Sequence, residues 1–332
     1  MLVSVIIPCF NEEKVIEDTY VQISTTLPDD DSFQYEFLFI DDGSRDETQS
    51  ILRHLGQQDS RVNVVSFSRN FGHQAAVSAG LRYCRGDLAV IIDADLQDPP
   101  GVIPEMIDLL LSTGSNVVYG VRRSRKGETF FKLLSAKLFY IILNKLSEVP
   151  LPADTGDFRI IDRKIIEAFN GLKENNKYIR GLISWMGFKQ TPYYYEREAR
   201  RGGSTKYTLK RMVRLATIAI FYFSKKPLLI STTFGFMSVA AGLVLSVWIL
   251  GNKIFNPQYL VSGWTSLVLA VIYFGGVQLL TIGILGHYIG SLFDEIKQRP
   301  EYIVDEILQP ESAPGPRGRG LAARRSLTVL RS

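Results

Sequence analysis

Acidic residues follow two apolar segments of the sequence, and they are the side chains with the most evident chemistry. Asp93 and Asp95 come directly after the apolar residues 88–92. Two carboxylates at positions i and i+2, where the chain turns, can converge on one hard cation, and the side-chain carbonyl of Gln97 is close enough to add a third oxygen. Mg²⁺ or Mn²⁺ held by these residues would stabilise the negative charge that develops on a departing diphosphate.

A second acidic turn, Asp41-Asp42-Gly43-Ser44, follows the apolar residues 35–40. Its carboxylates can accept hydrogen bonds from the imide of a uracil base or from ribose hydroxyls. An Asp-Gly turn followed by a capping serine is the structural alternative, but it leaves the second acid unexplained. Arginine can bind two phosphate oxygens at once. The candidate arginines for a diphosphate are Arg69, Arg122, Arg125, and Arg200 or Arg201.

The elements that must position these side chains alternate between strands and helices. Five apolar runs rich in β-branched residues are predicted to be buried strands. They cover residues 3–8, 35–40, 62–67, 88–92 and 117–119. Helices are predicted between them, the first with Asn11 as its N-cap. This alternation predicts an α/β fold with a mostly parallel sheet covered by helices on both faces. Ligands of such sheets bind beyond the carboxyl ends of the strands, where both acidic turns lie.

Two long apolar segments predict helices that span a membrane. Residues 228–250 carry no charge, and a helix of that length would be about 34 Å long, enough for a hydrocarbon core of roughly 30 Å. Residues 264–289 form the second span. The preceding stretch, residues 205–226, has a basic face that includes Lys206 and an opposite apolar face, which is typical of an interfacial helix. The flanking cations predict that both ends of the chain are cytoplasmic.

Charge and cysteine content weaken other classes of function. The net charge is only +4, so nothing favours binding to nucleic acid. The two cysteines have no metal-ligand spacing and are too few for a disulfide framework. Gly286 and Gly290 form a small-xxx-small pair that favours helix packing, and we expect a homo-oligomer. Residues 310–332 are rich in Pro, Gly and Arg, and we expect a disordered tail there.

Several motifs together resemble glycosyltransferase family two, which has the GT-A fold. They lie at residues 5–13, 41–44, 69–73, 93–100, 157–159 and 203–207. The octapeptide Asp-Ala-Asp-Leu-Gln-Asp-Pro-Pro at residues 93–100 is far more specific than an isolated Asp-x-Asp pair. The resemblance covers about residues 1–300. It is strongest to the dolichol-phosphate-mannose synthase group and its bacterial relatives that glucosylate undecaprenyl phosphate.

The resemblance implies a role for each motif. The residues that would line the nucleotide site are Pro8, Asn11, Glu12, Asp41 and Asp93, with Asp42 beside them. Asp95 and Gln97 would hold the metal. The cations that would contact the diphosphate or the acceptor phosphate are Arg122, Arg200 and Lys206. Asp157 is the family's candidate base. A phosphate monoester is already mostly dianionic at neutral pH, with a second pKa of ~6, so an orienting role for Asp157 stays open.

The implied reaction is the inverting, metal-dependent transfer of one hexose to polyprenyl (undecaprenyl) phosphate. Glucose is the preferred sugar, UDP the preferred nucleotide and the cell envelope the destination. The expected layout is a cytosolic catalytic domain (1–204), a juxtamembrane region (205–226), two spans (227–290) in the plasma membrane and a cytosolic segment (291–309). Two alternatives stay open. One is a processive polysaccharide synthase, whose Gln-x-x-Arg-Trp motif is missing from the sequence, and the other is a catalytically silent membrane scaffold.

Overall fold

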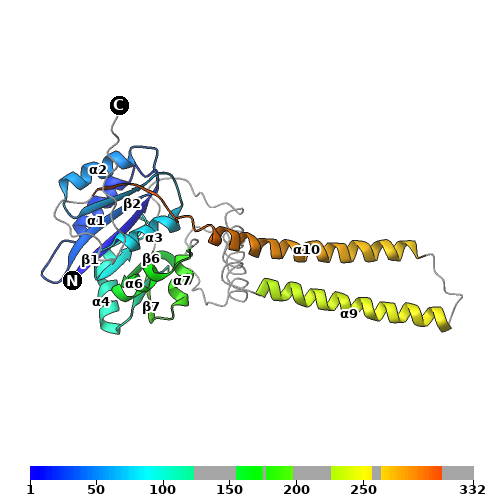
Figure 1. Ribbon diagram of the computed structural model, residues 1–332. Coiled ribbons are helices and arrows are strands. Elements are labelled where there is room, and N and C mark those ends of the chain that lie inside the picture. The colour runs from blue at the N-terminus through cyan, green and yellow to red at the C-terminus, as the bar shows by residue number, and fades with distance from the viewer. Residues whose placement is uncertain (123–154, 175–176, 197–225, 256–262, 309–332) are drawn as a thin grey trace, which may run out of the picture.

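The computed structural model describes residues 1–122, 155–174, 177–196, 226–255 and 263–308. This part of the chain forms a head built around one β-sheet, and two long helices project from it. The helices, α9 (Lys226–Phe255) and α10 (Trp264–Ile296), lie side by side (Figure 1). The predicted interfacial helix lies almost entirely outside the described residues. The division into domains and the expected homo-oligomer stay predictions.

Eight strands form the sheet in the order β7-β5-β6-β4-β1-β2-β3-β8. Their bounds are β1 (Leu2–Cys9), β2 (Gln34–Asp41), β3 (Val62–Phe67), β4 (Leu88–Ile91), β5 (Val117–Arg122), β6 (Thr155–Asp162), β7 (Gln190–Tyr195) and β8 (Val304–Leu308). β1 pairs in parallel with β2 and β4, β2 with β3, and β5 with β7. β6 and β8 run antiparallel to their neighbours. The predicted mostly parallel α/β sheet is confirmed, with three strands that the sequence patterns did not indicate.

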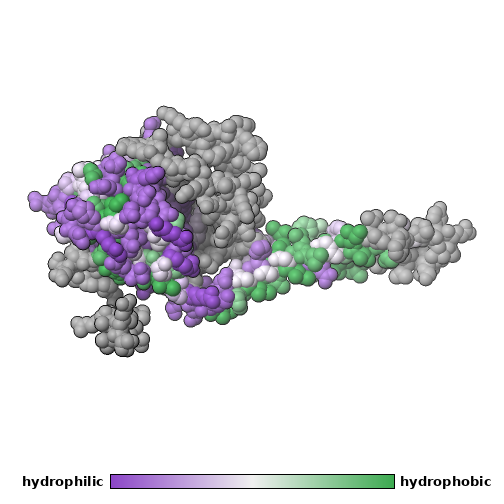
Figure 2. Space-filling model, turned by 90° about the horizontal axis from the view of Figure 1, so that it is seen from above, coloured by the Kyte–Doolittle hydropathy of each residue, from purple (hydrophilic) through white to green (hydrophobic). Residues whose placement is uncertain are grey.

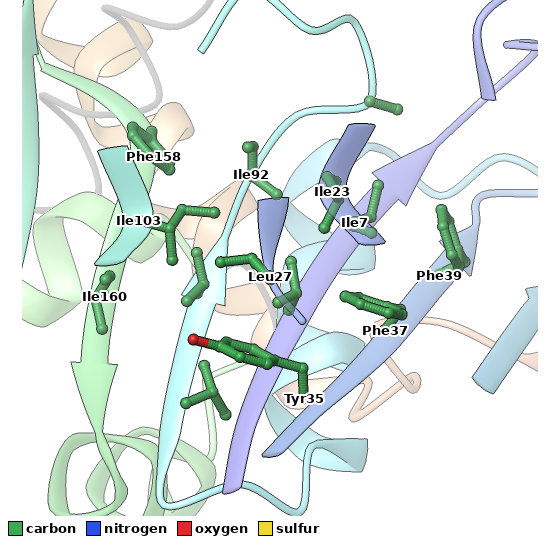
Figure 3. Close-up of a cluster of buried hydrophobic side chains, with 14 of the residues drawn as sticks. Ile7, Ile23, Leu27, Tyr35, Phe37, Phe39, Ile92, Ile103, Phe158 and Ile160 are labelled. Carbon is green, nitrogen blue, oxygen red and sulfur yellow. The ribbon is translucent and has the colours of Figure 1, made fainter. Parts of the chain in front are cut away.

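Helices cover both faces of the sheet, as predicted. One face packs against α1 (Ile16–Thr26), α2 (Thr48–Gln58) and α4 (Ile103–Thr113), and a 3₁₀ turn, η1 (Pro100–Val102), precedes α4. The other face packs against α3 (His73–Tyr83), α6 (Arg163–Gly171) and α7 (Ile179–Trp185). Successive strand residues point to opposite faces, so Ile7 of β1 packs towards α1 while Ile6 packs beneath α3. Figure 3 shows the first face, where Ile7, Phe37 and Phe39 lie near Ile23 of α1 and Leu27, the residue after α1.

The hairpin of α9 and α10 has the length and composition of a membrane anchor. The most apolar stretches are Lys226–Val244, with a mean hydropathy of 1.7, and Ala270–Ile296, with a mean hydropathy of 1.5. Large apolar side chains such as Phe236 and Leu279 are more than 70% exposed. The hydrophobic surface of the hairpin contrasts with the hydrophilic head (Figure 2). These two helices are long and apolar enough to cross a membrane, which would cover side chains that water would otherwise contact.

The chain returns from α10 to the head through a short segment that ends in β8, residues 299–308, here called the return segment. β8 pairs with β3, so the last described strand lies at the edge of the sheet beside the strands of the first half. The ring of Tyr302 stacks on Phe67 of β3 with 4.8 Å between centroids. Glu301 accepts a hydrogen bond from Ser78 Oγ of α3 at 2.8 Å. The return segment therefore ties the C-terminal end of α10 to the sheet.

Candidate active site

Several of the predicted site residues that the structure describes lie at one edge of the sheet, beyond the carboxyl ends of its parallel strands. Asp41 ends β2, and Asp93 follows the end of β4. β6 runs antiparallel to β4, with Ile91, the last residue of β4, opposite Arg159. Extending this register by two residues places Asp93 opposite Asp157. The topology of the sheet therefore places Asp157 at the Asp93 turn, although the two residues are far apart in the sequence.

Asp157 lies at the centre of a network of charged side chains. Arg180 of α7 donates to both of its oxygens, from Nε to Oδ1 at 2.6 Å and from Nη2 to Oδ2 at 3.0 Å. Nε2 of His73, the first residue of α3, donates to the same Oδ2 at 3.1 Å. The same nitrogen lies 3.7 Å from Oδ1 of Asp93. The network joins β6, α7, α3 and the turn after β4.

This network determines the protonation of its members. Burial would raise the pKa of Asp157, but the charge of Arg180 and the hydrogen bonds from His73 and Arg180 hold it well below its usual range. Burial would lower the pKa of His73, but the hydrogen bond to Asp157 and the charges of Asp93 and Asp157 raise it to about 9. Asp157 is therefore an anion and His73 a cation at neutral pH. A carboxylate with so low a pKa is a weak proton acceptor.

Asn11 joins the turn after β1 to the turn after β2. Its backbone N–H donates to Ser44 Oγ at 2.9 Å, and its Oδ1 accepts from the N–H of Arg45 at 2.9 Å. Its φ of 55° lies in the left-handed region, which asparagine tolerates better than most residues. The prediction that Asn11 caps a helix is wrong, because α1 begins only at Ile16 with Val15 before it. The asparagine side chain is used instead to hold two site turns together.

The two acids of the turn after β2 have different partners. Asp41 accepts a hydrogen bond from within its own turn, from the N–H of residue 44 at 3.0 Å. Asp42 accepts from Nδ2 of Asn70 at 2.8 Å and from the backbone N–H groups of Phe71 and Gly72 at 2.6 and 2.9 Å. Burial raises the pKa of both acids. The second acid therefore has a structural role, since it holds the loop that leads into α3.

The turn after β4 has the donor chemistry of a divalent-metal site. The N–H of Gln97 donates to Asp95 Oδ1 at 3.2 Å, and Leu96 between them has a φ of 53°, a conformation that is uncommon outside functional turns. Burial raises the pKa of Asp93, and nearby carboxylates add to this effect against the opposing charge of His73. Concentrated negative charge and oxygen donors suit Mg²⁺ or Mn²⁺. In the described ranges, no three His, Cys, Asp or Glu side chains form a ready-made metal site.

Arg122 ends β5 on the same side of the sheet, in register with Tyr195 at the end of β7. Its Nε donates to the Tyr195 hydroxyl at 3.4 Å, and its Nη2 lies 3.6 Å from Oδ1 of Asp98. The Tyr195 hydroxyl donates to the same oxygen of Asp98. Burial and the charge of Asp98 raise the pKa of Tyr195, so the phenol stays neutral. These contacts hold the guanidinium near the acidic turn, where it can face a diphosphate.

The other predicted residues divide into two groups. Pro8 is buried near the end of β1, Glu12 follows in the next turn, and Arg69 lies exposed with its guanidinium 4.1 Å from the ring centre of Phe71. The predicted cations that lie outside the described residues are Arg125, Arg200, Arg201 and Lys206. For all these residues, binding to a nucleotide sugar or an acceptor phosphate stays a prediction.

Four residues of the site were not predicted as site residues, and one of them, Asp98, lies within the quoted octapeptide at residues 93–100. His73 belongs to the quoted motif at residues 69–73, so its position there was a usable signal. Arg180 and Tyr195 carry no signal in the sequence, because α7 has only seven residues and β7 contains a proline, directly before its three tyrosines. Both reach the site through tertiary packing.

Comparisons with known proteins agree with this arrangement. Residues 4–169 match the family "Glycosyl transferase family 2". The chain is 45% identical over 303 residues to the uncharacterized glycosyltransferase YkcC of Bacillus subtilis (strain 168), across 91% of this chain and 93% of that protein. It is 36% identical over 308 residues to the prophage bactoprenol glucosyl transferase homolog of Escherichia coli (strain K12), across 92% and 99%.

Among solved structures, the chain aligns with a mannosyltransferase from Pyrobaculum calidifontis in complex with GDP-Man and Mn²⁺. That alignment has 16% identity and a TM-score of 0.48, and it covers 84% of this chain and 86% of the other. The family match runs from β1 through β6 into α6, and it includes Asp41, Asp93 and Asp157. The chain belongs to glycosyltransferase family 2, and it is a glycosyltransferase whose mostly parallel sheet is followed by two apolar helices.

Proposed function

We propose that this enzyme transfers one glucose from UDP-glucose to undecaprenyl phosphate, with inversion, at the cytoplasmic face of the plasma membrane. One observation carries the proposal. The similarity to the bactoprenol glucosyl transferase homolog extends over 92% of the chain, and so covers the hairpin as well as the acidic site. A polyprenyl tail confines its phosphate to the headgroup plane, and an enzyme anchored by an apolar hairpin works at that plane.

The donor would bind across the carboxyl ends of β1, β2 and β4. The nucleotide would lie on the turns of Asn11 and Asp41, which the contact of Asn11 with Ser44 holds together. Asp93, Asp95 and Gln97 would hold Mg²⁺ or Mn²⁺, with further oxygen ligands from the diphosphate. The metal would neutralise charge on the leaving diphosphate. Arg122 would contact the same diphosphate from β5, because Asp98 and Tyr195 keep its guanidinium in place.

The acceptor phosphate would attack the anomeric carbon from the face opposite the diphosphate. With a second pKa of ~6, it is mostly dianionic at neutral pH and needs little help from a base. This chemistry fits the ionised state of Asp157, which would orient a substrate group rather than remove a proton. We propose that Arg125, Arg200 or Arg201, and Lys206 add positive charge for the acceptor phosphate.

The test uses purified enzyme in detergent, undecaprenyl phosphate, Mg²⁺ and a panel of radiolabelled UDP- and GDP-sugars. We expect organic-extractable label from UDP-glucose alone, and its loss on adding EDTA or in Asp95→Asn. Asp18→Asn, which changes an exposed acid of α1, is the control and should keep full activity. Label from another donor would correct the sugar, and water-soluble polymer would support the processive alternative. No transfer from any donor, with folded protein, would support the silent scaffold.

A further inference from the structure

Arg180 is a partly buried arginine of the charged network around Asp157, and none of the sequence motifs includes it. It lies on α7, and its guanidinium contacts both oxygens of Asp157. We propose that Arg180 is a positioning residue of the transfer reaction, which sets the orientation of the Asp157 carboxylate towards the bound substrates. This inference rests on the proposed function and deepens it.

The geometry favours positioning, because a two-point contact fixes the plane of a carboxylate and a single contact does not. Nε and Nη2 of Arg180 bind different oxygens of Asp157, at 2.6 and 3.0 Å. Only 11% of the Asp157 side chain and 29% of the Arg180 side chain are exposed, so water screens the pair weakly. The carboxylate therefore has one orientation as long as the guanidinium stays in place.

The backbone around Asp157 is held by a second arginine. Arg159, which is 4% exposed, donates from Nε to the Asp157 carbonyl at 3.3 Å and from Nη2 to the Gly156 carbonyl at 3.1 Å. Arg159 thus contacts the backbone at Asp157 and Arg180 contacts the side chain, so the two arginines have different roles.

The contacts also indicate which oxygen faces a substrate. Oδ2 of Asp157 receives two donors, Nη2 of Arg180 and Nε2 of His73, while Oδ1 receives one from the residues that the structure describes. A carboxylate oxygen has about two lone-pair directions. Oδ1 therefore retains a direction for a hydroxyl group of a substrate. Without Arg180, the Asp157 carboxylate could rotate. It would keep its negative charge but lose its fixed orientation towards the substrate.

The experiment is a double-mutant cycle on lipid-linked sugar formation, with Arg180→Lys, Asp157→Asn and the double variant. Lysine keeps the charge but cannot bind two oxygens as a planar fork. We expect Arg180→Lys to lower kcat by about 10- to 100-fold, with the KM for the donor changed by less than about twofold. In the Asp157→Asn background, the same change should alter kcat by less than about twofold, because Arg180 acts through Asp157. If Asp157→Asn has no measurable turnover, Asp157→Glu takes its place.

The control is Arg61→Lys, which changes another arginine–carboxylate pair, with Asp59, at 2.8 Å and at the opposite end of the sheet. It should leave kcat unchanged. Additive losses in the cycle, or equal losses in Arg180→Lys and Arg61→Lys, would overturn the positioning role. A donor KM that rises as much as kcat falls would also overturn it, since that result indicates a distorted donor site.

A second cycle needs no substrate. The melting temperatures of the same variants in detergent should be non-additive, because the double variant has no pair left to break. Additive melting shifts would show that the contact does not form, and would overturn the inference even if the enzyme is active. A wild-type enzyme without transferase activity would instead refute the proposed function, and with it the catalytic part of the inference.

Discussion

Gly43 lies where two turns of the site approach each other. Its φ is +66°, and a Cβ atom built on it would lie 2.4 Å from the carbonyl carbon of Arg69. Gly43→Ala therefore has to push away the loop that Asp42 holds, in addition to the strain of the left-handed backbone. We expect a loss of about 2–3 kcal/mol in the free energy of unfolding and a higher KM for the donor. Thermal unfolding and initial rates measure the two effects.

Gly114→Ala is the matched control for this prediction. Gly114 ends α4 with a φ of +60°, but nothing lies within 4 Å of an added Cβ atom. In this variant the alanine adopts a left-handed backbone conformation but makes no steric clash, so we expect a loss of about 1 kcal/mol in the free energy of unfolding. The KM for the donor should stay unchanged. Equal destabilisation in the two variants would show that the contact with Arg69 is unimportant.

Local sequence patterns could reveal some site residues, whereas others depend on tertiary contacts. Asp41 and Asp93 follow apolar runs directly, so the local pattern was enough to place them at strand ends. Arg180 lies 23 residues after Asp157 on a separate short helix. Its role depends on a tertiary contact that no local spacing specifies. The second acid, Asp42, was found as a candidate ligand, and only the structure showed that it binds the next loop.

At the scale of elements, strands β1 to β5 were predictable, whereas the antiparallel strands β6 and β8 and the edge strand β7 were not. β1 to β4 are continuous apolar runs, because helices bury both of their faces. β8 reads Val-Asp-Glu-Ile-Leu and is only half-buried on alternate residues. β6 begins with Thr-Gly-Asp and contains two charged residues besides Arg159. Strand prediction relies on runs of apolar residues. β8 lacks such a run because it lies at the edge of the sheet, and β6 lacks one because it carries charged residues of the site.

The return segment contains Glu301, a carboxylic acid whose pKa differs between the folded and unfolded protein. Burial raises the pKa of Glu301 to about 7, against the hydrogen bond from Ser78 and the charge of Lys177. The folded protein therefore holds a proton that the unfolded chain releases near its ordinary pKa of 4.5. Since the native state binds more protons in this window, stability should fall as pH rises from about 4.5 to about 7.

Glu301→Gln mimics the protonated acid and should remove this pH dependence. We expect the variant to be more stable than the wild type at pH 8 by about 1–2 kcal/mol, a value reduced from the full linkage because the site is partly hydrated. Thermal unfolding between pH 4.5 and 8 measures the effect. Glu306→Gln in β8, where the carboxylate binds Arg53 at 2.5 Å, is the control. A wild-type slope retained in Glu301→Gln would contradict the assignment to Glu301.

At the scale of the whole molecule, the membrane hairpin is an insertion between two parts of one sheet. In the sequence, the hairpin of α9 and α10 lies between β7 and β8, so the sheet is completed only after the hairpin has been made. β8 also covers the edge of β3, whose unpaired backbone groups would otherwise invite association with other chains. The return segment accordingly has a stabilising role in the head that is separate from anchoring.

Two shortened proteins separate these roles. One ends at residue 226, and the other replaces residues 227–297 with a flexible Gly-Ser linker and so retains β8. The linker variant keeps the pairing of β8 with β3 and the stacking of Tyr302 on Phe67. We expect it to stay soluble without detergent. Its free energy of unfolding should exceed that of the truncated protein by about 2–4 kcal/mol, because β8 buries apolar area and Tyr302 stacks on Phe67.

Urea denaturation and light scattering compare the two proteins, and nucleotide binding reports whether each head is folded. The truncated protein should aggregate at lower concentration, because the edge of β3 and the ring of Phe67 are uncovered. Equal stability and solubility would mean that β8 merely rests on the sheet edge. A lower stability in the truncated protein alone would show that the catalytic head depends on the chain that follows the membrane hairpin. Any soluble form of this enzyme must then retain residues 299–308, although the family match ends at residue 169.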